Sequence, residues 1–241
     1  MAALEDSGFG RLIGVLVSPG KTFQSIAARP TWMAALVVLL IAATASSVLV
    51  SQRIDKEDMR KSIKERMEKG RGGQATPEQI ERGVEMGEKI SSVTRWLIPL
   101  FIVVIDLLVA LLFFAAFRFF GGSGIPYKTS FAVTLHAYMP TLVASLLALP
   151  LILSRRTITM KEAQEGSILA SNLGAFAPQS LGPAARALLS SVDFFSIWTV
   201  CLMIIGYRIA AKVSTTAATA VVLTLWGLYI AFKVGMAALF Q

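Results

Sequence analysis

Long apolar stretches alternate with short basic segments along this chain of 241 residues. Five of the stretches reach the roughly 20 residues that a helix needs to cross the hydrocarbon core of a bilayer. They cover, in approximate bounds, residues 31–52, 96–119, 130–153, 191–211 and 216–240. The pattern therefore predicts an all-α polytopic membrane protein with five transmembrane helices.

Two short amphipathic helices are predicted in residues 1–30, ahead of the first span. Leu12 and Leu16 follow helical spacing before the break at Ser18-Pro19-Gly20, and Phe23 and Ile26 follow it afterwards. Proline suits the first position of a helix, so a second helix is expected to begin at Pro19. We predict two half-helices that lie in the headgroup region of the membrane. The five-span membrane domain then occupies residues 31–241.

Residues 53–95 form a charged segment between the first two spans, with eleven Lys or Arg, nine Asp or Glu and a net charge of +2. Thr76-Pro77-Glu78-Gln79 is a capping box, which restarts a helix after the glycines at 70–73. We predict an extramembrane helical hairpin, which is either a solvated spacer or a docking surface for a partner. The candidate docking residues are Arg60, Lys64, Met67, Arg71, Glu81 and Glu85.

Composition narrows the classes of protein and partner. The chain is 55% hydrophobic and 16% charged, and a soluble domain normally carries about a quarter charged residues. The net charge is +8, but the basic residues lie at span ends and in the acid-rich segment rather than among aromatic side chains. We therefore expect contacts with membrane lipids and no nucleic-acid partner. The single cysteine, Cys201, excludes an internal disulfide framework, and we predict no cofactor.

Asp106 is the sharpest candidate for chemistry, because it lies near the middle of the second span. A charged side chain there costs about 2.5–3.5 kcal/mol on insertion scales, so it is expected to face the interior and to be paired or protonated. Lys233 in the last span is the best partner, and His136 in the third span is the only histidine. The three residues could serve a small transporter or channel. A purely structural role for Asp106 is the alternative.

Other motifs carry weaker signals. One histidine does not make a metal site, so His136 is better explained as a buried, hydrogen-bonded side chain. Pro140 is expected to bend the third span. Ser190 or Ser191 is expected to cap the fourth span, with Asp193 in its first turn.

Gly121-Gly122-Ser123-Gly124 matches the GxSG string of rhomboid intramembrane proteases, but it lies in a connecting turn and has no further support as a hydrolase site.

Small residues recur every fourth position in the last span, at Gly227, Ala231 and Gly235. This spacing lets two helices approach closely in a membrane. The face is expected either to pack within the bundle or to form a homo-oligomer.

Several segments, taken in order, resemble the bacterial members of the YIP1 domain family. They are Ser18-Pro19 with Thr22-Phe23 and Arg29-Pro30, Gly121-Gly122 with Tyr127 and Tyr138-Met-Pro140, Ser171-Asn172-Leu173-Gly174, and Asp193 to Trp198 with Gly206 and Lys212. The resemblance covers nearly the whole chain. The charged segment at 53–95 is the part least like the family.

The resemblance implies a five-span integral membrane protein with a cytosolic N-terminus, here in the inner membrane of a bacterium. Eukaryotic relatives associate with Rab-type GTPases and with each other in vesicle traffic, and no catalytic residue comes with the family. The resemblance thus favours a non-enzymatic adaptor for other membrane proteins, such as an accessory subunit of an export or envelope-trafficking complex. With the N-terminus inside, fifteen Lys and Arg would lie in outer segments and seven in inner segments. Because Lys and Arg are normally in excess on the inner side, this count favours the opposite orientation.

Overall fold

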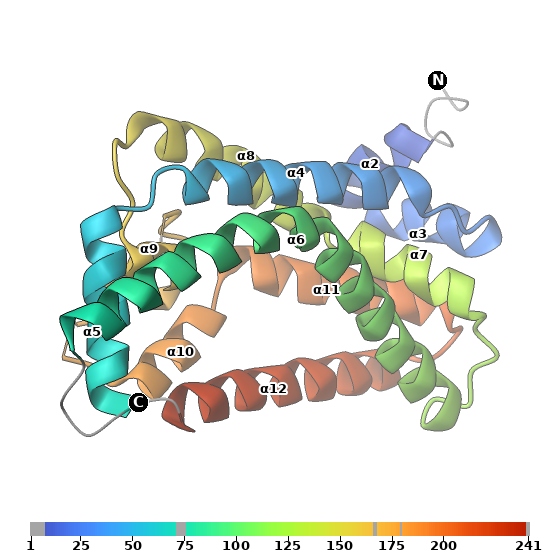
Figure 1. Ribbon diagram of the computed structural model, residues 1–241. Coiled ribbons are helices and arrows are strands. Elements are labelled where there is room, and N and C mark those ends of the chain that lie inside the picture. The colour runs from blue at the N-terminus through green and yellow to red at the C-terminus, as the bar shows by residue number, and fades with distance from the viewer. Residues whose placement is uncertain (1–7, 71–75, 166–167, 179, 240–241) are drawn as a thin grey trace.

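The computed structural model describes residues 8–70, 76–165, 168–178 and 180–239. In these ranges the chain forms α-helices and one short 3₁₀ helix, with no β-strand (Figure 1). The predicted all-α class is confirmed.

The first two helices are α2 (Gly8–Val17) and α3 (Pro19–Ala28). They are separated at Ser18, and proline occupies the first turn of α3 as predicted. Phe23 and Ile26 are fully buried, and α3 packs against α11 and α7. The outer side of α2 stays apolar and exposed at Phe9, Ile13 and Val17. The placement of these helices in the headgroup region stays a prediction.

Two long helices and a shorter one follow: α4 (Met33–Ser51), α5 (Lys56–Gly70) and α6 (Pro77–Phe119). The predicted capping box is confirmed at the start of α6, where the Thr76 hydroxyl accepts from Gln79 N–H and the Gln79 side chain accepts from Thr76 N–H. The helix then continues without interruption for 43 residues, into and through the predicted second span. The residues that join α5 to α6 lie outside the described ranges.

The third predicted span is two helices, α7 (Tyr127–Ala137) and α8 (Met139–Ser154). The break falls at Tyr138, and Pro140 lies in the first turn of α8. The predicted bend at Pro140 is confirmed, because proline lacks the N–H that would continue the ladder of α7.

The last part of the chain holds α9 (Met160–Glu165), η1 (Leu173–Phe176), α10 (Pro183–Ser191), α11 (Phe194–Ala210) and α12 (Thr215–Leu239). The predicted cap of α11 is wrong by two residues or more. Ser190 and Ser191 belong to α10, and Asp193 itself caps α11 by accepting a 3.0 Å hydrogen bond from Ser196 N–H.

The helices run between two ends of the bundle (Figure 1). At one end, called here the α3 end, lie α2, α3, the start of α7, the connection 121–126 and the start of α12. At the other, called the α5 end, lie α5, α9, α10 and the C-terminal end of α12. The buried core is richest near the α3 end, where α3, α7 and α11 pack together.

Four helices of the described chain are long and apolar enough to cross a membrane. They lie at Met33–Ser51, Leu97–Phe119, Tyr127–Ser154 and Thr215–Leu239. The count of five spans is not confirmed, because the predicted fourth span is the shorter helix α11 of 17 residues. At 1.5 Å per residue such a helix is about 25 Å long, against a hydrocarbon core of about 30 Å. It is shortened by the Asp193 cap at its start and by its termination at Ala211.

Candidate functional site

Asp106 lies on the face of α6 that points into the bundle. It shares this face with Ala110, Phe113 and Phe117, which recur at helical spacing and are all buried. The Asp106 side chain is only 7% exposed. The sequence predicts that Asp106 faces the interior of the bundle, and its buried position agrees with that prediction.

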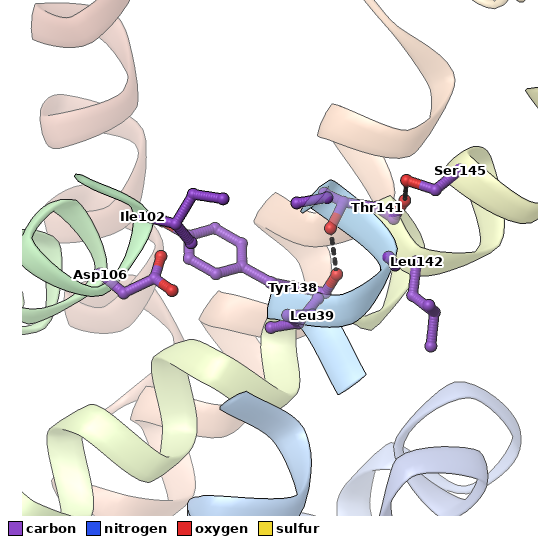
Figure 2. A pocket seen from close by; sticks show the side chains of 9 residues that line it. Leu39, Ile102, Asp106, Tyr138, Thr141, Leu142 and Ser145 are labelled. Atoms are coloured by element: carbon purple, nitrogen blue, oxygen red, sulfur yellow. Dashed lines mark hydrogen bonds between the residues drawn. The ribbon is translucent and has the colours of Figure 1, made fainter. Parts of the chain in front are cut away.

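A small cavity of about 120 Å³ opens beside the Asp106 carboxylate. Figure 2 shows the carboxylate pointing toward the ring of Tyr138, at the break between α7 and α8. The other lining residues come from α4, α6 and α8, and they are Leu39, Ala42, Ala43, Ile102, Thr141, Leu142 and Ser145. The cavity therefore joins one carboxylate to a largely apolar wall at the point where a membrane helix is interrupted.

The hydroxyl groups of Thr141 and Ser145 in this cavity are engaged with the backbone. Thr141 Oγ1 donates to the carbonyl oxygen of Tyr138 at 2.7 Å, and Ser145 Oγ donates to that of Thr141 at 2.9 Å (Figure 2). No hydrogen bond or ion pair joins the Asp106 carboxylate to another described residue. Asp106 is thus a buried acidic group without a hydrogen-bonding partner in the described chain.

Lys233 is not brought to Asp106 within the described residues. Its ammonium group donates to Ser190 Oγ at 3.1 Å and to Ser191 Oγ at 3.2 Å, at the C-terminal end of α10. The register of α12 decides this, because Lys233 falls in the part of the helix that packs against α10 at the α5 end. Lys233 therefore links α12 to α10 through these two hydrogen bonds.

His136 lies in α7 and is also separate from Asp106. It is buried, and its Nδ1 lies 2.8 Å from the carbonyl oxygen of Ala132, one turn earlier in the same helix. No group of three or more potential metal ligands occurs among the described residues. Asp106, Lys233 and His136 do not form one site.

A buried polar cluster that the sequence analysis did not single out lies in the core. The Tyr207 hydroxyl is 2.7 Å from Ser130 Oγ and 2.8 Å from Thr134 Oγ1, and Ser130 Oγ donates to the carbonyl oxygen of Ala110. The Tyr207 ring stacks on Phe113 and Phe117. The available signal was the four-residue spacing of Ser130 and Thr134 on one face of α7. The cluster binds α6, α7 and α11 together.

Ser123 has a structural role in the connection between α6 and α7. Its Oγ donates to the carbonyl oxygen of Ala211 at 2.9 Å and accepts from Ile125 N–H at 3.1 Å. The serine of the GxSG string is therefore in a turn, as predicted, and its hydroxyl anchors the connection to the end of α11.

Three of the candidate docking residues lie at the contact between α5 and α6. Arg60 and Glu81 form an ion pair of 2.8 Å across the two helices, and the sulfur of Met67 lies 3.0 Å from the position that a Cβ on Gly83 would take. Lys64 and Glu85 are exposed, and Arg71 lies outside the described residues. Met86 and Ile90 follow helical spacing in the sequence but were not among the candidate docking residues, and they are 63% and 58% exposed on the same stretch of α6.

The small-residue face of α12 is exposed. Gly227, Ala231 and Gly235 all lie on the surface, and a Cβ built on either glycine meets no atom within 4 Å. Of the two predicted uses of this face, packing within the bundle has no support in the described chain.

These features define an all-helical integral membrane protein, with long apolar helices whose outer surfaces are exposed. Residues 13–236 match the Yip1 domain, and the chain belongs to this family. A comparison with curated proteins and a comparison with solved structures gave no match.

Proposed function

We propose that this protein is a non-enzymatic membrane scaffold or adaptor that binds other membrane proteins, as an accessory subunit of an export or envelope-trafficking complex. The observation that carries the proposal is the Met86 and Ile90 pair. Both side chains are large, apolar and exposed, one turn apart on a stretch of α6 rich in charged residues. Exposed apolar patches rimmed by polar residues mark protein or membrane interaction sites. A partner helix laid along α6 would bury them.

The geometry of α5 and α6 supports presentation of this pair on a rigid element. Gly83 and Gly87 let α5 approach closely, since the Ile63 side chain lies 3.2 Å from the Cβ position of either glycine. The Arg60–Glu81 ion pair spans the same contact. We propose that α5 and residues 77–95 form a hairpin outside the membrane.

The base of α5 is tied to the connection after α8, which further supports a fixed orientation. Asp55 N–H donates to the carbonyl oxygen of Ile158, and Ile158 N–H donates to that of Arg53. Asp58 Oδ2 accepts a 2.7 Å hydrogen bond from Met160 N–H. Because Ile158 is also fully buried, the two connections at the α5 end brace each other.

We propose five membrane crossings, with α11 as the fourth, and a cytoplasmic N-terminus in an inner membrane. A helix of 17 residues lies at the lower limit for a span. α11 packs along α7 and α12 and ends at the α3 end, which favours a crossing over a surface position. Reporter fusions after residues 54, 123, 160 and 213 test this topology. Successive fusions should alternate between the two sides of the membrane.

A second interaction surface is proposed on α12 within the membrane. Its exposed small-residue face suits close approach of another transmembrane helix, from a second copy or from a different protein.

The adaptor is tested by purification of the full chain in a mild detergent. We expect a stoichiometric partner with the unchanged chain, loss of that partner with Met86→Asp and Ile90→Asp together, and its retention with Arg82→Gln. Arg82 is an exposed residue one turn before Met86, so it is the matched control. A chain that is always recovered alone, or a partner indifferent to both changes, would contradict the proposal.

A small transporter is the second candidate, favoured by the break between α7 and α8 beside Asp106. Interrupted helices near the membrane midplane are typical of transporter binding sites. The structure supports a transporter less than it supports the adaptor, since the cavity is small and holds one carboxylate. Proteoliposomes with the chain and with Asp106→Asn should differ in proton or sodium uptake if this function is correct. Equal uptake in both, at the level of empty liposomes, excludes it.

A further inference from the structure

The described segments that meet at the α3 end of the bundle carry basic residues and no acidic ones. Segments 8–34, 113–131 and 204–219 meet at this end and contain no Asp or Glu. Their six exposed cations are Lys21, Arg29, Arg118, Lys128, Arg208 and Lys212. No ion pair engages these six side chains within the described chain. All exposed charged side chains in these described segments are therefore cationic.

A cavity of about 590 Å³ opens at the same end. Its walls come from α3, the connection 121–126, the start of α7 and the end of α11. Polar side chains line it at Gln24, Ser123, Thr129 and Lys212. Gln24 and Lys212 are exposed at its rim, so the cavity is accessible from outside.

Lys212 occupies a special backbone position in the wall. Its φ angle is +55°, a left-handed conformation that residues other than glycine and asparagine rarely adopt. The neighbouring Ala211 carbonyl accepts the 2.9 Å hydrogen bond from Ser123 Oγ, which fixes the end of α11 against the connection 121–126. Lys212 thus follows a residue whose carbonyl group is hydrogen-bonded to the connection 121–126, which forms another wall of the cavity.

The cavity lies at the ends of candidate membrane helices, where the headgroup region of a bilayer is expected. It lies where α7 begins and α11 ends, and the connection 121–126 in its wall directly follows the exposed Phe119 and Phe120 in the sequence. Aromatic side chains gather at this boundary in membrane proteins. Anionic lipid headgroups are attracted to basic pockets between helices at that depth.

We propose that this cavity binds the phosphate group of an anionic phospholipid, with Lys212 as the cation in the wall and Lys21 and Arg208 beside it. Lys21 shares a face of α3 with Gln24, and Arg208 lies one turn before Lys212. The surrounding apolar helices favour a lipid over a free phosphate ion, since they would contact the acyl chains. This inference does not depend on the adaptor function.

The test is a titration of the full chain, purified in detergent, with fluorescent phosphatidylglycerol and phosphatidylcholine. We expect the chain to prefer phosphatidylglycerol and Lys212→Asn to weaken its binding about fivefold, as removal of one basic residue near a lipid surface implies. Asparagine tolerates the left-handed backbone, so the fold is kept. Lys212→Arg should retain binding. Lys61→Asn, which removes an exposed cation at the α5 end, is the matched control and should change nothing.

A second variant fills the cavity and leaves every charge in place. Gly124 lines the cavity, and a Cβ there meets no atom within 4 Å, so Gly124→Leu is accommodated and should also weaken phosphatidylglycerol binding. Equal affinity for the two lipids, or equal loss with Lys61→Asn and Lys212→Asn, overturns the proposal. Titration with inorganic phosphate separates the two sources. Phosphate that binds alone and displaces the lipid completely would identify a free-anion site and also overturn it.

Discussion

The guanidinium group of Arg11 donates a 2.7 Å hydrogen bond to the carbonyl oxygen of Arg29. Arg11 lies in α2 and Arg29 ends α3, so the bond closes the corner between the two N-terminal helices. The same guanidinium donates to Ser25 Oγ and to Thr31 Oγ1. Arg11 is nearly fully buried, which makes it the organising residue of this corner.

Arg11→Met should destabilise the protein by about 2 kcal/mol, because hydrogen bonds from a charged donor are lost and their buried acceptors remain. Thermal unfolding in detergent measures this as a lower midpoint. Lys21→Met, an exposed cation on α3, is the control and should leave the midpoint unchanged. Equal midpoints for the two variants would show that the corner contributes nothing to stability.

Gly206→Ala should destabilise the packing of α3, α7 and α11. A Cβ at this position would lie 2.7 Å from Val133 Cγ1 and 2.9 Å from the Phe23 ring, so the neighbouring helices must shift. Overpacking of this kind costs about 1–3 kcal/mol. Gly227→Ala makes the same change on the open face of α12, where nothing lies within 4 Å, and should be neutral or stabilising. Unfolding of both variants in detergent gives the comparison.

Glu162 should make the connection after α8 sensitive to acid. Hydrogen bonds from Thr159 N–H and Thr159 Oγ1, together with Arg155, hold the pKa of the Glu162 carboxyl below its ordinary value. A lowered pKa in the folded state adds stability above the unfolded value of 4.5, and this stability is lost as the pH falls through the folded value.

The unchanged chain should therefore unfold at a higher temperature than Glu162→Gln at pH 7. The difference should shrink as the pH falls below 4.5 and vanish once the pH is below the lowered pKa of the folded state, where the carboxyl is protonated in both states. Glu85→Gln, at an exposed position on α6, controls for general effects of charge. A difference between the unchanged chain and Glu162→Gln that does not shrink as the pH falls below 4.5 would contradict the assignment of the shift to the ionised carboxyl.

Gly227→Leu with Gly235→Leu should reduce association through α12. Bulky side chains on a small-residue face keep two membrane helices apart. We expect the double variant to shift toward the monomer in light scattering or crosslinking of detergent-purified chain, with unfolding unchanged because the face is open in the protomer. Leu228→Ala, at an exposed position beside the face, is the control. Identical oligomer distributions would assign the face to lipid contact.

The class of the protein follows from the sequence because it depends on local properties. Runs of apolar residues long enough to cross a bilayer predict membrane helices wherever they fold, and this places α4, α6 and α12 within a few residues. The Thr76–Gln79 capping box and the break at Pro140 are also local, since each acts within one turn of helix. The ordered motifs around Tyr138 and Asp193 carried the family resemblance in the same way.

Tertiary contacts decided what local patterns leave open. The sequence predicts that Asp106 and Lys233 pair because both lie toward the same membrane face in their spans. That position does not fix the rotation and tilt of a helix. In the fold, packing of α12 against α10 directs Lys233 to Ser190 and Ser191. The length of α11 depended on Asp193 as its cap, which hydrophobicity does not report. The Tyr207 cluster and the cavity beside Lys212 each join segments roughly 70 or more residues apart, up to nearly 190, so only the folded chain brings them together.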